Sequence, residues 1–212
     1  MAFFAATKMA KFALLVLSSA VLVVTGLPAD SASTLAPEPQ AILGTGGNTI
    51  LPYASVGPAA APTPYRLLPP HLDTPWTEKV GTNPWPQHPR PRLVRDDWVT
   101  LNGIWTYQSA SSGDELNNPP QSLAQEVLIP SCIESGISGI MAENVMYMWF
   151  ATNFKVPSDW DKDNHVVLIF EAVDYEATVF VNGHKVGFHR GGYFRFTIDV
   201  TEHIKFGESN EL

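Results

Sequence analysis

Apolar and polar residues alternate with a period of two between Val173 and Asn182, the spacing of a strand that buries one face. The face expected to pack inward carries Val173, Tyr175, Ala177, Val179 and Val181. The outer face carries Asp174, Glu176, Thr178, Phe180 and Asn182. Asn182-Gly183 is a dipeptide favoured in type I′ turns, and the run from Lys185 to His189 follows it as a return strand. The pattern predicts a β-hairpin with both carboxylates outside, because a slip of one residue would bury them.

Short runs of alternating apolar and polar residues continue through the rest of the C-terminal two thirds of the chain. Strands are expected at 99–108, 125–129, 145–156, 165–171, 176–181, 185–189 and 194–199. No long stretch of this part has a helical period, and turn signals such as Pro119-Pro120 and Gly191-Gly192 separate the runs. The spacing predicts an all-β fold, an antiparallel sandwich or jelly roll. The continuously apolar run 165–170 predicts a central strand covered on both faces.

The N-terminal third follows a different pattern. Lys8 and Lys11 precede an apolar run at 12–24, and small or turn-forming residues come next, which is the order of a secretory signal. We expect residues 1–29 to be a leader that is removed, which makes the mature protein secreted and extracellular, with no membrane contact after cleavage. A retained signal anchor is the alternative, although the run is shorter than the roughly 20 residues of a spanning helix.

Proline marks the segment that follows the predicted leader. Of the 18 prolines in the chain, 13 lie between positions 37 and 91. Residues 30–73 therefore read as an extended Pro/Ala-rich linker, and residues 74–212 as the folded domain. Just after the linker, Trp76 and Trp85 are expected to dock on the domain and order the chain around them.

Charge and residue counts exclude several classes of protein. The 212 residues carry a formal net charge of -8, which argues against nucleic acid or an anionic membrane as a partner. The six histidines are scattered without ligand-like spacing, so we expect no metal and no other cofactor. Cys132 is the only cysteine, so no intramolecular disulfide forms, and we expect it to be a buried small hydrophobe. For Glu134 we expect a local structural role, with contact to a partner domain as the alternative.

Six motifs in the predicted domain stand in a characteristic order. They are Pro89-Arg90-Pro91 with Arg95 and Trp98, Leu101-Asn102-Gly103-Ile104-Trp105, Ile129-Pro130-Ser131-Cys132-Ile133-Glu134-Ser135, Ala172-Val173-Asp174-Tyr175-Glu176-Ala177, Val181-Asn182-Gly183, and Gly187-Phe188-His189-Arg190-Gly191-Gly192-Tyr193. Together they resemble the N-terminal sugar-binding domain of glycoside hydrolase family 2, which includes β-galactosidases, β-glucuronidases and β-mannosidases. Where many members have a Tyr-Arg-Arg pattern, this chain has Phe150-Ala151-Thr152.

The resemblance implies a galactose-binding-like sandwich from a retaining glycosidase that hydrolyses O-glycosyl bonds. It also implies that both catalytic glutamates lie on a separate TIM barrel, which takes about 250 residues. The present chain matches the sandwich alone, so we expect it to be inactive by itself.

Asp174 and Glu176 raise the question of a catalytic couple within this domain. A retaining glycosidase needs two carboxyl groups about 5 to 5.5 Å apart in a sugar-sized cleft. Alternate positions on a strand are about 6.5 to 7 Å apart, but such pairs are commonly solvated or make interdomain contacts. We therefore expect no catalytic residue here. The candidate carbohydrate or interdomain contacts are Asp174, Glu176, His189, Arg190 and Tyr193, beside a Gly-Gly turn that frees the backbone.

Three hypotheses of function follow. The first is an accessory domain of a secreted family 2 glycosidase, whose partners are carbohydrate and the catalytic barrel C-terminal to it in the same polypeptide. The alternatives are a free-standing carbohydrate-binding module, with Tyr193 and Phe194 as its aromatic platform, and an adhesion domain on a proline-rich stalk. Residues 206–212 are expected to be a turn that opens into a further strand, so we expect the chain to be a fragment.

Overall fold

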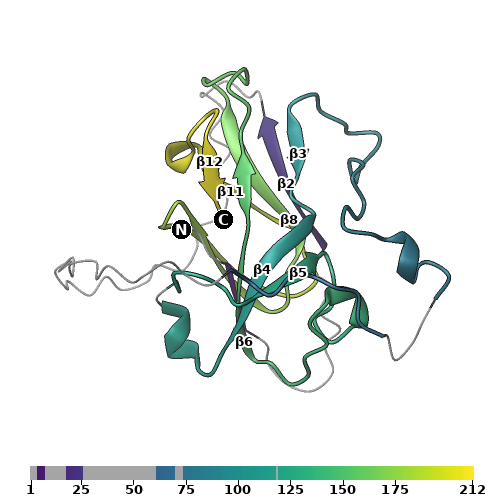
Figure 1. Ribbon diagram of the computed structural model, residues 1–212. Coiled ribbons are helices and arrows are strands. Elements are labelled where there is room, and N and C mark those ends of the chain that lie inside the picture. The colour runs from purple at the N-terminus through teal and green to yellow at the C-terminus, as the bar shows by residue number, and fades with distance from the viewer. Residues whose placement is uncertain (1–3, 8–17, 26–60, 70–73, 118) are drawn as a thin grey trace.

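The computed structural model describes residues 4–7, 18–25, 61–69, 74–117 and 119–212, and these residues form an all-β fold (Figure 1). The strands are β1 (Phe4–Thr7), β2 (Ser18–Thr25), β3 (Trp98–Thr100), β4 (Gly103–Ala110), β5 (Gln125–Ile129), β6 (Tyr147–Ala151), β7 (Asn153–Lys155), β8 (His165–Ala172), β9 (Glu176–Val181), β10 (His184–Arg190), β11 (Phe196–Asp199) and β12 (Ser209–Glu211). Short 3-10 helices lie in the connections: η1 (Thr77–Lys79), η2 (Gly113–Asn117), η3 (Gly136–Ser138) and η4 (Thr201–His203). Among the described residues, no helix has the length and hydropathy needed to cross a membrane.

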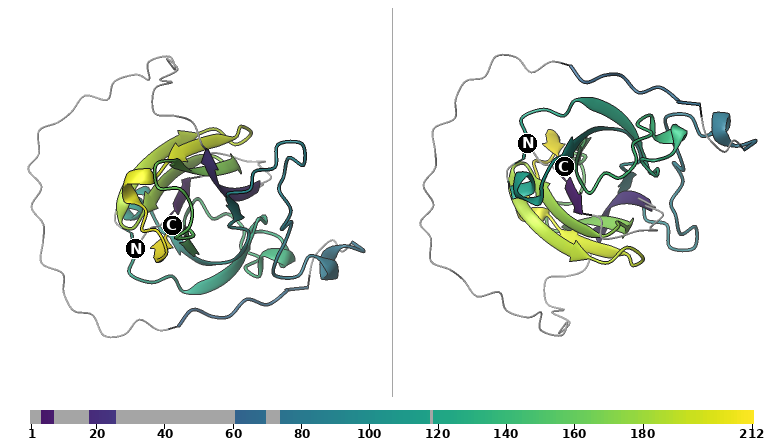
Figure 2. Two further views of the ribbon diagram at one scale, coloured as in Figure 1. Left: turned by 90° about the horizontal axis from the view of Figure 1, so that it is seen from above. Right: turned by 90° about the horizontal axis from the view of Figure 1, so that it is seen from below.

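The strands form three antiparallel sheets. The largest has the order β10-β9-β1-β6-β4-β5, the second has the order β11-β8-β2-β3, and β12 pairs with β7 in a small third sheet. Seen from above and below, the curved strands surround a common core (Figure 2). The predicted antiparallel β-sandwich is therefore confirmed.

Two of the predicted strands match the structure residue for residue, and two others are divided. The predictions 125–129 and 176–181 coincide with β5 and β9. The predicted strand 99–108 breaks between Thr100 and Gly103, because β3 and β4 belong to different sheets and Gly103 has a φ of +140°. The predicted strand 145–156 breaks at Thr152 into β6 and β7, where the Thr152 backbone pairs with Leu212. Both divisions mark points at which the chain passes from one sheet to another.

β8 is central in its sheet, as predicted, but its two faces differ. It lies between β11 and β2. Val166, Leu168 and Phe170 point inward and are buried, whereas Val167 and Ile169 on the other face stay partly exposed. The prediction that both faces are covered is therefore wrong for the outer face, where Val167 and Ile169 line a cavity together with residues of the segment 88–95.

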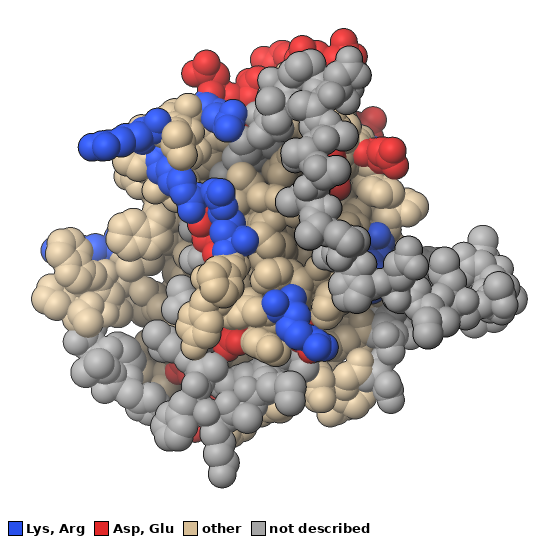
Figure 3. Space-filling view, turned by 180° about the vertical axis from the view of Figure 1, so that it is seen from behind, with Lys and Arg blue, Asp and Glu red and all other residues tan. Residues whose placement is uncertain are grey.

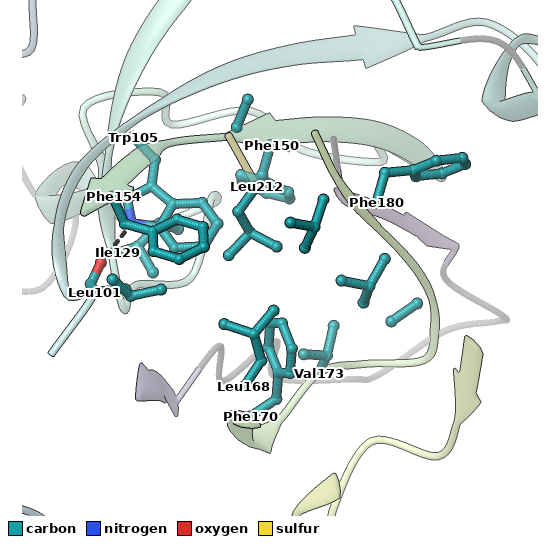
Figure 4. Packing of buried hydrophobic residues seen from close by; sticks show 14 of the residues in the cluster. Leu101, Trp105, Ile129, Phe150, Phe154, Leu168, Phe170, Val173, Phe180 and Leu212 are labelled. Carbon is teal, nitrogen blue, oxygen red and sulfur yellow. Dashed lines mark hydrogen bonds between the residues drawn. The ribbon is translucent and has the colours of Figure 1, made fainter. Parts of the chain in front are cut away.

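Large apolar side chains from several sheets fill the core (Figure 4). The indole Nε1 of Trp105 donates a hydrogen bond of 2.6 Å to the carbonyl oxygen of Leu101, so the ring is buried without leaving its donor unpaired. Phe150, Leu168 and Leu212 are 1%, 0% and 0% exposed. Leu212 is thus a core residue of the sandwich.

The N-terminal predictions meet the structure only in part. β1 and β2 fall within the predicted leader, and the structure pairs them with other strands of the sandwich. The rest of the leader and most of the linker lie outside the described residues, so leader removal and secretion stay predictions. Residues 61–69 run beside β5, where the amide of Thr63 donates to Ala124 O at 2.8 Å and the amide of Glu126 donates to Thr63 O at 2.9 Å.

The expected docking of Trp76 and Trp85 is wrong. These side chains are 68% and 70% exposed. Other contacts hold this segment to the domain: Arg90 forms an ion pair with Glu171, and the Asn102 side-chain amide donates to Pro84 O at 3.1 Å. Fixed polar partners, rather than aromatic burial, order this part of the chain.

Candidate functional site

The candidate residues gather where the β9–β10 hairpin opens toward β11. At the closed end of the hairpin, Asn182 and Gly183 have φ values of 50° and 82°, as the predicted type I′ turn requires. A bulge between Lys185 and Gly187 then shifts the register by one residue. Because of that shift, Glu176 lies opposite Arg190, where an unbroken ladder would place His189 opposite it.

Glu176 and Arg190 form an ion pair across the two strands. Arg190 Nη2 lies 2.5 Å from Glu176 Oε1, and the side chains are 61% and 24% exposed for Arg190 and Glu176. A carboxylate that makes a charge-assisted contact with a guanidinium is held in place by it. Glu176 is therefore part of a paired surface.

Asp174 takes a different position from Glu176. It precedes β9 and packs against the Gly-Gly turn, so closely that a Cβ on Gly192 would lie 2.7 Å from Asp174 Oδ1. The amide of Gly191 donates a hydrogen bond of 2.7 Å to Tyr175 O, which fixes the turn against the start of β9. The two carboxylates do not line either of the cavities described below.

His189 is part of a stack of three aromatic rings. Its ring lies 4.1 Å from that of Phe196 at an interplanar angle of 12°, and Phe196 in turn stacks on Phe170 at 4.7 Å. The Nε2 atom of His189 is buried and makes no hydrogen bond to the described residues. The stack joins β10, β11 and β8, so the ring of His189 connects two sheets.

Tyr193 and Phe194 form the exposed part of the site, here called the aromatic platform. Their side chains are 88% and 74% exposed on the turn between β10 and β11. Exposed neighbouring aromatic rings are uncommon on a monomer and mark contact surfaces for sugars or proteins. Of the five candidate residues, Glu176, Arg190 and Tyr193 present side-chain groups to solvent. Asp174 instead packs against the Gly-Gly turn, and His189 stacks on Phe196.

A cavity of about 370 Å³ lies beside β8, and sequence reasoning did not identify it as a site. Arg90, Arg95, Arg195, Glu171 and Ile169 are among its lining residues. Arg90 Nη1 and Nη2 donate to the two oxygens of Glu171 at 2.6 and 2.9 Å, and this hydrogen bonding raises the pKa of Arg90. The signal in the sequence is the Pro89-Arg90-Pro91 motif, followed closely by Arg95.

A second cavity, of about 400 Å³, lies at the edge of β4. Trp105, Glu126, Asn153 and Glu211 are among its lining residues. It is built from the described linker segment 61–62 together with strands of two sheets. No group of three possible metal ligands occurs in the part of the chain that the structure describes.

The environment of Cys132 differs from the expected apolar one. The thiol is only partly buried, and its Sγ lies 2.7 Å from Glu134 Oε2. The Glu134 charge also acts on Tyr107: burial, and then this charge, raise the pKa of Tyr107 to about 12. Glu134 therefore has a local side-chain partner in Cys132, as the expected local role requires.

Charged side chains of both signs share the face opposite to that of Figure 1. Lys and Arg form an irregular line there, with Asp and Glu among them and along the upper rim (Figure 3). This mixed surface differs from the continuous basic stripe that a nucleic-acid-binding protein would present.

Comparison with known proteins gives the following matches. The family model described as "Glycosyl hydrolases family 2, sugar binding domain" matches residues 99–212. A β-glucuronidase of Formosa agariphila is 41% identical over 63 residues, which are 30% of this chain and 6% of that protein. A β-galactosidase of Thermoanaerobacter pseudethanolicus is 44% identical over 64 residues, which are 30% of this chain and 8% of that protein. The solved β-glucuronidase of an uncultured Clostridium sp. is 28% identical with a TM-score of 0.44, over 52% of this chain and 20% of that one.

Proposed function

Because the chain belongs to the sugar-binding domain family of the family 2 glycosyl hydrolases, we propose that it is the accessory sandwich of a secreted, β-galactosidase-like enzyme. In this proposal the enzyme hydrolyses O-glycosyl bonds, and its acid and nucleophile lie on a catalytic barrel that the sandwich supports. The names of the matched relatives support this class of reaction. Each matched segment covers less than a tenth of those two relatives, so the activity of the whole protein is part of the proposal.

The observation that carries the proposal is the aromatic platform above an ion-paired hairpin. Glu176 is held by Arg190, and the described carboxylates of the candidate site do not share a cleft, so the domain offers contact surface in place of catalytic groups. Tyr193 and Phe194 stand on a turn that a backbone hydrogen bond fixes, which limits the entropy lost when they bind. In the complete enzyme this platform contacts the barrel at the mouth of the sugar pocket.

The first test is turnover of the complete enzyme. Tyr193→Ala and Phe194→Ala should each lower kcat/KM by about 2- to 13-fold, the equivalent of one aromatic contact of about 0.5 to 1.5 kcal/mol. Trp76→Ala removes a ring of similar exposure elsewhere, so it is the matched control and should leave kcat/KM unchanged. Equal turnover in all four proteins would exclude the platform as a contact.

The second test uses the 212-residue chain alone with nitrophenyl β-glycosides. We expect no turnover, because Asp174 and Glu176 do not line either of the two cavities described above. Turnover that Glu176→Gln abolishes would contradict the proposal.

The exposure of the platform also favours a second candidate, a free-standing carbohydrate-binding module. Titration calorimetry of the chain with galacto-, glucurono- and manno-oligosaccharides separates the two functions. Saturable heat that Tyr193→Ala removes would indicate the module. No saturable heat with any of the three sugars would support the accessory domain.

A further inference from the structure

The cavity beside β8 combines positive charge with apolar side chains. Its lining comes from the segment 88–95, from the outer face of β8, and from the start of β11. Arg90, Arg95 and Arg195 stand among these residues against one carboxylate, that of Glu171. The whole chain carries a formal net charge of -8, so this local excess of positive charge is opposite in sign to the average. The cavity therefore attracts anions on a protein that otherwise repels them.

The pairing of β8 with β11 explains why one of these arginines has no counterion. Thr197 of β11 lies opposite Ile169 of β8. Continued by two residues, the same register places Arg195 opposite Glu171, where side chains on one face are close neighbours. Both oxygens of Glu171 nevertheless accept from Arg90, at 2.6 and 2.9 Å. The carboxylate is thus taken from the other side, and Arg195 has no ion pair within the described part of the chain.

Arg95 is a second cation of the cavity without a counterion. It is exposed at the end of the segment 88–95, and it forms no ion pair with any residue that the structure describes. A guanidinium offers five N–H donors in a planar fork that matches the geometry of an oxyanion. Arg90 already spends two of its donors on Glu171, whereas Arg95 and Arg195 keep all of theirs. Two such groups at one cavity favour a ligand with an oxyanion.

The size and the apolar side of the cavity favour an oxyanion carried on a sugar ring over a small free ion. Its volume of about 370 Å³ lies within the range of small-molecule sites, about 300 to 1,000 Å³. Val167 and Ile169 are partly exposed there, and the C–H face of a pyranose ring packs against such side chains. Thr197 adds a hydroxyl that can donate to a ring oxygen or accept from a ring hydroxyl. A free ion would leave these groups without contact.

We infer that this cavity, here called the arginine cavity, binds an acidic saccharide, a pyranose that carries a carboxylate or a sulfate group. Arg95 and Arg195 pair with the anionic group, and the ring packs on the apolar side of the cavity. The bidentate pair of Arg90 with Glu171 is a positioning contact, because it holds the segment 88–95 beside β8. The inference goes beyond the proposed function, since it uses neither the aromatic platform nor a catalytic barrel.

Binding to the 212-residue chain tests the inference with two ligands that differ in charge. Methyl β-glucuronide and methyl β-glucoside share one ring, but the first has a carboxylate where the second has a hydroxymethyl group. In an NMR titration at low salt, the glucuronide should bind about tenfold more tightly than the glucoside, the gain of a charge-assisted contact. This preference should shrink in high salt, because the two arginines are exposed. A sulfated glucose in the same titration shows which of the two oxyanions the cavity prefers.

Arg195→Met and Arg95→Met should each reduce the preference for the glucuronide to about threefold or less, because each removes one of the two guanidinium groups. Methionine keeps an unbranched side chain, and neither change breaks an ion pair among the described residues, so the melting temperature should stay the same. Arg92→Met is the matched control. Arg92 is an exposed arginine of the same segment that does not line the cavity, so this variant should keep the full preference.

Equal binding of the glucuronide and the glucoside would overturn the inference, and so would a preference that survives Arg195→Met unchanged. Tighter binding of an oligoglutamate peptide than of either acidic sugar would also overturn it and would identify an acidic peptide as the occupant. Acetate that binds as tightly as the glucuronide would mean an adventitious ion only. The aromatic platform is tested by Tyr193→Ala, which should leave the preference for the glucuronide intact, so failure of the proposed function is distinguishable from failure of the arginine cavity.

Discussion

The buried hydroxyl of Tyr107 should cost the sandwich stability in alkaline solution. Tyr107 lies on β4, is 2% exposed and packs its ring 5.5 Å from that of Phe150. Its hydroxyl makes no hydrogen bond to any described residue. Burial, and then the negative charge of Glu134, raise its pKa from 10.0 to about 12, because a phenolate here would lose hydration and be repelled.

The raised pKa fixes the direction and size of the effect. Above pH 10 the unfolded chain releases the phenolic proton while the folded chain keeps it, so the free energy of unfolding falls as the pH rises. The contribution is complete below pH 10 and is lost as the pH rises through about 12. At pH 11 the loss is about 1.4 kcal/mol, and the full difference between the two pKa values corresponds to about 2.7 kcal/mol.

Urea unfolding of the wild-type chain, Tyr107→Phe and Tyr193→Phe at pH 8 and pH 11 measures this loss. Phenylalanine keeps the ring packing, so at pH 8 Tyr107→Phe should be at least as stable as the wild type, since an unsatisfied buried hydroxyl costs about 1 to 3 kcal/mol. Its advantage should grow by about 1.4 kcal/mol at pH 11. Tyr193→Phe changes an exposed ring and should follow the wild type. Burial also raises the pKa of Tyr65, so Tyr107→Phe keeps part of the alkaline loss. Equal losses in the wild type and Tyr107→Phe would refute the reasoning.

Three further experiments test contacts that hold the sandwich together. In a double-mutant cycle of unfolding free energies, Arg90→Ala and Glu171→Gln should show a coupling of about 1 kcal/mol, because the two side chains form a bidentate pair. This coupling should be weaker in 1 M salt. Additive effects of the two substitutions would mean that the pair contributes nothing to stability. Gly139→Ala should lower the unfolding free energy by about 1 to 3 kcal/mol, because the φ of Gly139 is +80° and a Cβ there would lie 2.7 Å from the ring of Tyr65. Gly81 has a φ of +61° but lies in open space. Gly81→Ala should therefore lower the unfolding free energy by only about 1 kcal/mol in the same urea titration. Asn210→Ala should lower the unfolding free energy by about 2 to 4 kcal/mol, because its 1% exposed amide both donates to and accepts from neighbouring backbone; a thermal melt unchanged from the wild type would contradict this.

The sequence by itself determined the elements whose signals are local. Period-two alternation gave the inward positions Ala177, Val179 and Val181 of β9, although Phe180, predicted on the outer face, is also buried. Asn182-Gly183 set the turn after β9, because positive φ is a property of the residues at the turn itself. The sequence was also sufficient to predict the all-β class, the order of the family motifs, and the bounds of β5 and β9. Local signals also indicated the candidate residues: Asp174 and Glu176 alternate along the strand pattern, and the other three lie within the five successive positions 189–193.

Tertiary structure decided which of those residues meet. A bulge on β10, where a Cβ on Gly187 would lie 2.5 Å from Ile198 of β11, shifts the register so that Arg190 reaches Glu176. That shift also turns His189 onto Phe196, a contact with a different sheet. Periodicity specifies the face of a strand but not its partners, because the partners come from distant parts of the chain and are selected by packing between sheets.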